Sequence, residues 1–239
     1  VLLVGMGFIY IYSFFFVTVY SEDDIREHFD TPIMAQVTKL KKRSINPMEP
    51  FLHLYTNLNN KHLLKGGKTI AVCSGHAKEG KSIVTAQLGK LLASFDINVL
   101  LIDMNMEKPT LHEYFKMENY AGMDDILEHD AHAHSLIRTN GMQNLSLITA
   151  GSKSATTSTQ VFSPRTGSFL EKMRAEYDVI LIDTAAVTRR LDAAAIMQLC
   201  DANLYLFRKG HSRKRRLSKA KSFIQKYQIP NVYLVYNRG

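Results

Sequence analysis

The chain has 239 residues, of which 46% are hydrophobic and 22% charged, and this is an ordinary composition for a globular protein with a sizeable core. Its formal net charge of +8 calls for an anionic partner or surface without saying which. Two cysteines, Cys73 and Cys200, exclude a disulfide framework, and their apolar surroundings predict buried thiols in a reducing compartment.

Residues 1–20 carry no charged side chain. A helix rises about 1.5 Å per residue, so a run of this length spans the roughly 30 Å hydrocarbon core of a bilayer. The sequence therefore predicts a transmembrane helix over residues 1–20, with a buried core helix as the alternative. Basic residues follow at Arg26 and between Lys39 and Arg43, so the positive-inside rule places the C-terminal side in the cytoplasm.

Residues 21–65 are expected to form a polar juxtamembrane linker with helical parts. Ser21 and the acidic residues after it predict a short helix that ends at Pro32, followed by an extended stretch. A second helix is predicted from Glu49. Its apolar side chains recur at helical spacing and form one face, made of Phe51, Leu54, Tyr55 and Leu58.

Short apolar runs alternate with helical patterns over residues 66–239. This alternation predicts an α/β fold with a mostly parallel sheet covered by helices on both faces. Such sheets bind ligands at the carboxyl ends of their strands. The predicted strands have the sequences KTIAVCS, NVLLID, NLSLITAG, DVILID, NLYLFR and NVYLVYN.

A phosphate-binding loop is predicted between the first of these strands and the helix that follows. Two glycines separated by four residues precede Lys-Ser, which is the spacing of a P-loop. Backbone N–H groups of such a loop converge on phosphate oxygens, and the helix N-terminus adds its positive dipole end. An ordinary strand–loop–helix turn is the alternative. The predicted nucleotide-binding residues are Gly75, His76, Ala77, Lys78, Glu79, Gly80, Lys81, Ser82 and Ile83.

Within that loop, Lys81 is expected to reach the β- and γ-phosphates, and the Ser82 hydroxyl to bind Mg²⁺. Asp103 and Asp183 each end a predicted strand, where a carboxylate faces the ligand crevice and can hold Mg²⁺. Taken alone, either could be a cap or turn residue. Asp103 is also the candidate base that accepts the proton of a hydroxyl nucleophile.

Six segments in order resemble the bacterial tyrosine kinase domain of capsular and exopolysaccharide chain-length regulators: SGHAKEGKS, VLLIDMNMEKPTLHEYF, GMDDIL, YDVILIDTAAV, LDAAAI and CDANLYLFRKG. The upstream part is similar to the stretch that joins the second membrane helix to the kinase in the fused form. The resemblance implies a P-loop NTPase that binds ATP or ADP with Mg²⁺ through Walker A, A′ and B motifs. It also implies autophosphorylation of tyrosines in trans within a ring, and it aligns Asn237 with an asparagine near the adenine.

Several positions depart from the family pattern. Walker A′ usually has Asp-x-Asp-x-Arg, whereas Asn105 and Glu107 stand at its last two positions here. Asn105 remains a candidate Mg²⁺ ligand, because its amide oxygen can bind the ion without adding charge. The ring motif keeps Glu49, but its two arginine positions hold Leu52 and Tyr55.

These observations predict an ATP-binding tyrosine-autokinase-like domain on the cytoplasmic side of a bacterial inner membrane, with Lys81, Asp103 and Asp183 as catalytic residues. Its expected partners are the membrane, the polysaccharide export machinery and further copies of itself; nucleic acid is not expected, because no base-reading module is present. A degenerate nucleotide-binding scaffold is the alternative. A partition-type ATPase is a third reading, although His76 stands where such proteins carry a signature lysine.

Overall fold

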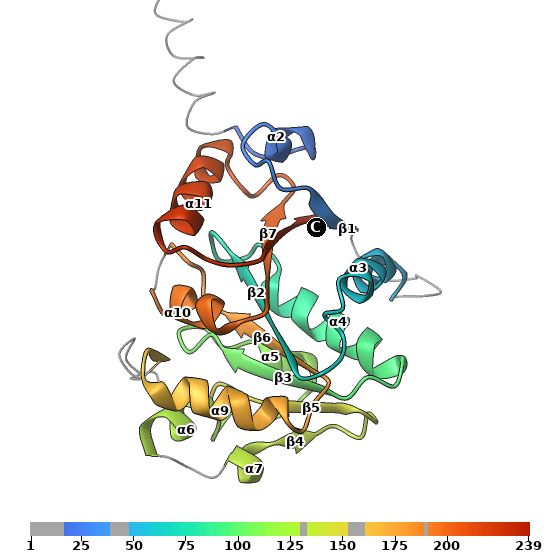
Figure 1. Cartoon of the computed structure of the whole chain (residues 1–239), viewed down its shortest axis with the longest axis vertical. Helices are drawn as coiled ribbons and strands as arrows, with labels where there is room; N and C mark the ends of the chain where they lie inside the picture. The colour runs from blue at the N-terminus through green and yellow to red at the C-terminus, as the bar shows by residue number, and fades with distance from the viewer. Residues whose placement is uncertain (1–16, 39–47, 130–132, 153–160, 189–190) are drawn as a thin grey trace, which may run out of the picture.

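The structure is a computed structural model that describes residues 17–38, 48–129, 133–152, 161–188 and 191–239 (Figure 1). Its described part contains an eight-stranded sheet in the order β1-β8-β7-β2-β6-β3-β5-β4. All neighbouring strands are parallel except β4, which pairs antiparallel with β5. The strands are β1 (Ile33–Val37), β2 (Lys68–Ser74), β3 (Val99–Met104), β4 (Arg138–Thr139), β5 (Leu145–Ile148), β6 (Val179–Thr184), β7 (Ala202–Arg208) and β8 (Val232–Asn237).

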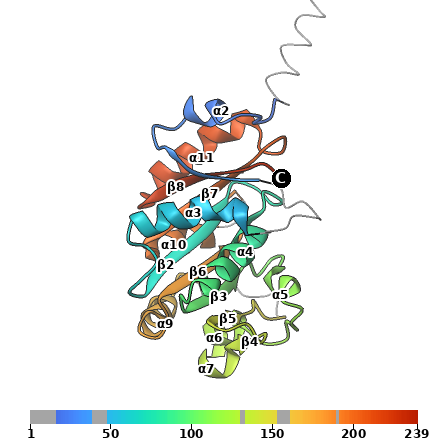
Figure 2. The same ribbon diagram turned by 90° about the vertical axis from the view of Figure 1, so that its right-hand side faces the viewer.

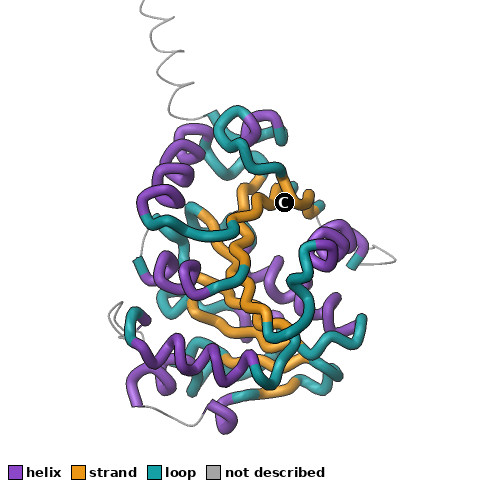
Figure 3. The backbone as a smooth tube through the Cα atoms, in the orientation of Figure 1, coloured by secondary structure: helices purple, strands orange, loops and turns teal. Residues whose placement is uncertain are grey.

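Helices cover both faces of this sheet, as the sequence predicted. Figure 2 looks onto the face with α3, α4 and α5, whereas α9, α10 and α11 lie on the opposite face in Figure 1. The backbone tube shows the strands running between these layers (Figure 3). The helices are α2 (Asp23–Arg26), α3 (Glu49–Asn60), α4 (Lys81–Ser94), α5 (Leu111–Tyr114), α6 (Met123–His129), α7 (Ala133–Leu136), α9 (Pro164–Arg174), α10 (Asp192–Leu199) and α11 (Lys214–Lys226).

Alternate side chains of the central strands enter two separate cores. Leu100 and Ile102 of β3 pack with α6, α9 and α10, whereas Val99 and Leu101 pack with α3 and α4. All four side chains are fully buried. A strand buried on both faces must be apolar throughout, which explains why these strands are continuous hydrophobic runs rather than alternating ones.

The described parts of the expected linker, residues 21–38 and 48–65, are part of this fold. β1 lies at the sheet edge beside β8, and the Asn57 side chain of α3 donates a hydrogen bond to Met34 O of β1 at 2.6 Å. Ile25 and Phe29 belong to the core beneath α11. Residues 33–37, which the sequence predicts to belong to the linker, thus pair with the sheet edge that β8 offers.

The transmembrane prediction over residues 1–20 falls mostly outside the described residues, since these begin at Val17. The last four residues of that prediction are not helical: Thr18 forms an isolated bridge with Arg213, and Val19 is fully buried. Val19 N–H donates to Ser212 O at 2.7 Å, and Gly210 N–H donates to Val19 O at 2.8 Å. None of the described helices is long and apolar enough to cross a membrane.

Cys73 and Cys200 are buried free thiols, which confirms that prediction. Burial raises the pKa of both thiols far above the ordinary value, so neither is a reactive thiolate.

Candidate functional site

The predicted phosphate loop connects the end of β2 at Ser74 with the start of α4 at Lys81, which is the context that the motif requires. Gly80 precedes the helix with a φ of +98°, a region that favours glycine. A Cβ atom at this position would lie 2.2 Å from Asn237 Nδ2. Glycine is therefore needed here both for its backbone conformation and for the close approach of β8.

Lys81 extends inside the loop rather than into solvent. Its side chain is buried, and Nζ donates a hydrogen bond to Ser74 Oγ at 3.2 Å. Ser74 Oγ in turn donates to His76 O at 2.8 Å. A buried ammonium group at the N-terminus of α4 adds a full positive charge to the helix dipole, so this position favours an anion.

Asp103 and Asp183 are direct neighbours across β3 and β6, and both are fully buried. Asp103 accepts hydrogen bonds from Asn105 N at 3.0 Å and Leu111 N at 3.1 Å. Burial, together with the Asp183 charge, raises the pKa of Asp103 well above its ordinary value despite these bonds.

Asp183 has a different environment from Asp103. Neither of its carboxylate oxygens has a hydrogen-bond partner among the described residues. Burial raises the pKa of Asp183 to about 6, while the Lys81 charge and the Ser82 hydroxyl act in the opposite direction. An orphaned buried carboxylate beside a second acid is a donor set that suits a hard cation such as Mg²⁺.

The remaining predicted metal ligands lie at the same edge of the sheet. Ser82 Oγ accepts a hydrogen bond from Thr110 Oγ1 at 2.9 Å. Asn105 follows the end of β3, and its Nδ2 donates to Lys108 O at 2.8 Å. The Ser82 hydroxyl lies close enough to Asp183 to lower the pKa of that carboxyl, whereas the Asn105 side chain is bonded within its own turn through Nδ2.

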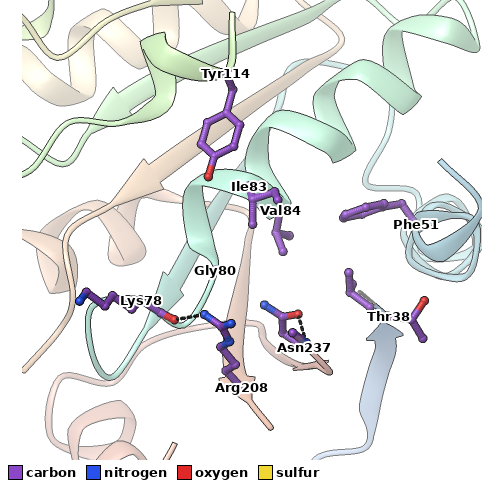
Figure 4. A pocket seen from close by; sticks show the side chains of 11 residues that line it. Thr38, Phe51, Lys78, Gly80, Ile83, Val84, Tyr114, Arg208 and Asn237 are labelled. Atoms are coloured by element: carbon purple, nitrogen blue, oxygen red, sulfur yellow. Dashed lines mark hydrogen bonds between the residues drawn. The ribbon is translucent and has the colours of Figure 1, made fainter. Parts of the chain in front are cut away.

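A cavity of about 400 Å³ lies beside the loop (Figure 4). Asn237, predicted from the resemblance, lines it and donates through Nδ2 to Glu79 O at 3.0 Å. Figure 4 shows Lys78 and Arg208 on one side of this space and Phe51 on the other. Its lining residues are Val37, Thr38, Phe51, Lys78, Gly80, Ile83, Val84, Tyr114, Arg208, Asn237 and Gly239.

Sequence reasoning missed the residues that reach this site from distant elements. Thr188, in the loop after β6, donates through Oγ1 to Gly75 O at 2.5 Å. Arg208 ends β7, and Phe51 comes from α3. The rule that parallel sheets bind at their carboxyl ends, which identified Asp103 and Asp183, would also have drawn attention to Arg208.

Comparisons with known proteins agree with this architecture. Residues 67–208 match the family model described as AAA domain. The chain is 31% identical over 156 residues to "Tyrosine-protein kinase CpsD" of Streptococcus pneumoniae serotype 4, covering 64% of this chain and 68% of that relative. It is also 31% identical to "Tyrosine-protein kinase ptk" of Acinetobacter johnsonii, but it spans only 20% of that protein's length and 60% of its own.

Solved structures show the same fold at low sequence identity. The kinase domain of Escherichia coli tyrosine kinase ETK superposes with a TM-score of 0.83 at 19% identity, covering 92% of this chain and 94% of that one. The MinD cell division protein of Aquifex aeolicus gives 0.58 at 20% identity, covering 72% and 69%. From the matched family model and the CpsD relative, the chain belongs to the bacterial tyrosine-protein kinases, within the AAA domain family of P-loop proteins.

Proposed function

We propose that this chain binds ATP and ADP with Mg²⁺ and is the tyrosine-kinase domain of a capsule or exopolysaccharide biosynthesis system. The observation that carries the proposal is the buried ammonium group of Lys81 at the start of α4. It lies beside the Asp183 carboxylate of β6, whose oxygens have no hydrogen-bond partner among the described residues. Relatives named as tyrosine-protein kinases and a "Succinoglycan biosynthesis transport protein ExoP" from Rhizobium meliloti support the biological assignment.

In this proposal the loop amides and Lys81 bind the phosphate tail, and the cavity lined by Phe51, Val84 and Asn237 accepts the nucleoside. Ser82 and Asp183 would hold Mg²⁺, with Asp103 and Asn105 beside it. When bound, Mg²⁺ neutralises charge on the phosphate oxygens.

The proposed transfer moves the γ-phosphoryl group of ATP to a tyrosine hydroxyl. The bond between the γ-phosphorus and the β–γ bridging oxygen breaks, a bond to the phenolic oxygen forms, and ADP leaves. The phenolic proton passes to Asp103, whose raised pKa makes its ionised form a better base than an exposed aspartate. Lys81 stabilises the charge that develops on the transferred group.

A second candidate is a scaffold that binds nucleotide without transferring phosphate. The observation favouring it is at Walker A′, where Asn105 is neutral and is bonded through Nδ2 to Lys108 O, and Glu107 is exposed. Phosphoryl transfer depends on charge neutralisation around the phosphates, so a lost charge there lowers rate more than binding.

We also propose that the domain works at the bacterial inner membrane, with its nucleotide site in the cytoplasm and with the polysaccharide export machinery and other copies of this chain as partners. The support is the uncharged sequence of residues 1–16, which precedes the folded segment beginning at Val17, and the named relatives. At the predicted ring motif, Tyr55 stacks on Phe95 of its own chain at 4.5 Å between ring centroids. Assembly would therefore use contacts other than the arginine pairs of the family.

The test is to incubate the full chain with ATP, Mg²⁺ and a Glu–Tyr copolymer, and to measure phosphotyrosine and nucleotide binding in parallel. We expect both to be lost in Lys81→Ala and kept in Lys172→Ala, an exposed lysine on α9. Binding without phosphotyrosine in the unmodified chain would support the scaffold. Absence of ATP and ADP binding would overturn both candidates.

A further inference from the structure

The turn between β7 and α11, residues 209–213, lies against the phosphate loop. Together with the last residue of β7, it contacts three consecutive loop residues. Two of these contacts hold backbone carbonyls, and the third holds a side chain. They run from Arg208 Nη1 to Lys78 O at 2.8 Å, from His211 Nε2 to Ala77 O at 3.0 Å and from Ser212 Oγ to Glu79 Oε1 at 2.5 Å.

The loop has a reason to need this external support. Lys78 has a φ of +66°, in the left-handed region that disfavours residues with a Cβ atom. Such a conformation persists only when surrounding contacts hold it. The carbonyl of Lys78 is the group that Arg208 binds, and the carbonyls on its two sides, Ala77 O and Glu79 O, accept from His211 and Asn237.

Glu79 is the loop residue whose contacts are hardest to explain by phosphate binding alone. Its carboxylate is buried in a loop that should attract anions, and an unrestrained negative charge there would repel a phosphate. Both oxygens are instead engaged: Oε2 accepts from His76 N at 2.8 Å and Oε1 accepts from the Ser212 hydroxyl. The carboxylate thus joins the start of the loop to the turn and engages the His76 amide.

Ser212 is well suited to fix that carboxylate, because it is itself held on two further sides. Its hydroxyl oxygen accepts from Arg208 N at 2.8 Å, so the hydroxyl proton is directed at Glu79. Its carbonyl accepts from Val19 N at 2.7 Å, and its side chain is 1% exposed. The Ser212 hydroxyl can therefore donate only towards Glu79, and its burial leaves the side chain little room to move. We expect this contact to hold the Glu79 carboxylate in one position.

We propose that Ser212 is a positioning residue of the nucleotide site, which acts through Glu79 to keep the phosphate loop in its binding shape. The ligands concerned are nucleoside di- and triphosphates, because Glu79 belongs to the predicted phosphate loop rather than to the part of the cavity proposed for the nucleoside. This inference rests on the proposed nucleotide binding. The claim that Ser212 holds the loop through Glu79 can, however, be tested without a ligand.

The first arm of the test measures amide hydrogen exchange of residues 76–80 in the nucleotide-free chain. Loss of a hydrogen bond to a charged group should make these amides exchange about tenfold faster in Ser212→Ala. Ser218→Ala, an exposed serine on α11, the helix that follows the turn, should leave the exchange unchanged. If Ser212→Ala does not fold, Ser212→Cys carries the same test, because a thiol has the same shape as a hydroxyl at slightly larger size but donates only weakly. Unchanged exchange in the Ser212 variant would overturn the inference.

The second arm measures binding of ADP with Mg²⁺ by calorimetry for Ser212→Ala, Glu79→Ala and the double variant. We expect Ser212→Ala to bind about tenfold more weakly, and the double variant to bind no more weakly than Glu79→Ala alone. Multiplicative losses, or an affinity of Ser212→Ala within twofold of the unmodified chain, would show that Ser212 does not act through Glu79. A chain that binds no ADP at all would overturn the proposed function, and the exchange arm would still decide the positioning role.

Discussion

In the phosphate loop, side chains from β7, β8 and the turn after β7 hold Ala77, Lys78 and Glu79 by hydrogen bonds. At the acidic edge beside it, by contrast, both oxygens of the Asp183 carboxylate lack a hydrogen-bond partner among the described residues. The two regions are adjacent, and Glu79 in the loop is buried like Asp103 and Asp183 at the acidic edge.

The difference separates two ways of preparing a binding site. The loop backbone is held by hydrogen bonds to other parts of the chain, so its contribution to affinity would come from preorganisation. The acidic edge has its carboxylates in position across β3 and β6, but burial outweighs the favourable Lys81 charge at Asp183, whose oxygens have no hydrogen-bond partner among the described residues. A buried, unpaired carboxylate lowers the stability of the free protein, and a cation that neutralises it recovers that free energy as binding.

The largest expected effect follows from replacing Asp183 by asparagine, which keeps the shape and removes the charge. Because the folded pKa of about 6 lies above the ordinary 3.8, the ionised form is the costly one at neutral pH. We therefore expect Asp183→Asn to raise the free energy of unfolding at pH 7 by about 1–3 kcal/mol. The same change should weaken Mg²⁺-dependent ADP binding about 100-fold.

Chemical denaturation and calorimetry measure the two effects of Asp183→Asn. Asp96→Asn is the matched control, since Asp96 is exposed and its φ of +57° suits asparagine as well as aspartate. A less stable Asp183→Asn protein would contradict the view that the burial cost of the Asp183 carboxylate is not fully compensated by its surroundings.

Gly80→Ala tests the loop side of the comparison. The added Cβ must adopt a φ of +98° and would lie 2.2 Å from Asn237 Nδ2. We expect the free energy of unfolding to fall by about 2–3 kcal/mol, because strain in the left-handed region adds to a clash with β8. Thermal unfolding in the absence of nucleotide is the measurement.

Gly167→Ala in α9 is the control for that change, since a Cβ there meets no atom within 4 Å and the residue is helical. It should stabilise the protein by about 0.5–1 kcal/mol, so the two alanine variants shift in opposite directions. Equal shifts would mean that the loop backbone is not held as tightly as its hydrogen bonds indicate.

The part of the site that could be predicted from sequence is the part encoded locally. The glycine spacing before Lys81 defines a short loop over residues 75–80, and strand and helix flank it directly. Asp103 and Asp183 were also predictable, because each ends a run that is apolar on both faces. Parallel register then places equivalent ends side by side.

The contacts that support the loop could not be predicted in this way. Ser212 and Glu79 are 133 positions apart, and a serine at the start of a basic helix carries no pattern that indicates a buried partner. The pairing of β1 with β8 has the same origin, since it joins Gln36 to Tyr236 across 200 positions. Long-range pairing depends on the whole topology, whereas sequence patterns report local conformation.

Lys78→Gly sharpens the comparison at the residue that the turn holds in place. Glycine adopts the φ of +66° without a Cβ penalty, so the variant should be more stable by about 1 kcal/mol. Lys78→Ala keeps the penalty and removes only the exposed amine, so it should change stability little. Denaturation midpoints measured without nucleotide distinguish the two, and a stabilising alanine variant would show that charge rather than backbone strain is the cost.

The smallest expected effect concerns Asp24, near the segment that holds the turn at Val19. Burial raises the pKa of Asp24, but Lys214 and the amides of Tyr20 and Ser21 outweigh it and lower the pKa from 3.8 to about 2. The ionised form therefore contributes stability above pH 3.8, and this contribution is lost as the pH falls through about 2.

Asp24→Asn should accordingly flatten the fall in unfolding free energy between pH 4 and 2, while costing less than about 1 kcal/mol at pH 7, as partly exposed ion pairs do. Asp23→Asn, an exposed neighbour, is the control that changes the same net charge. Denaturation curves at several acidic pH values provide the measurement. If both variants give the same acid profile, the contacts of Asp24 do not stabilise the N-terminal segment. The support of the phosphate loop would then come from Ser212 and not from the segment around Val19 that contacts it.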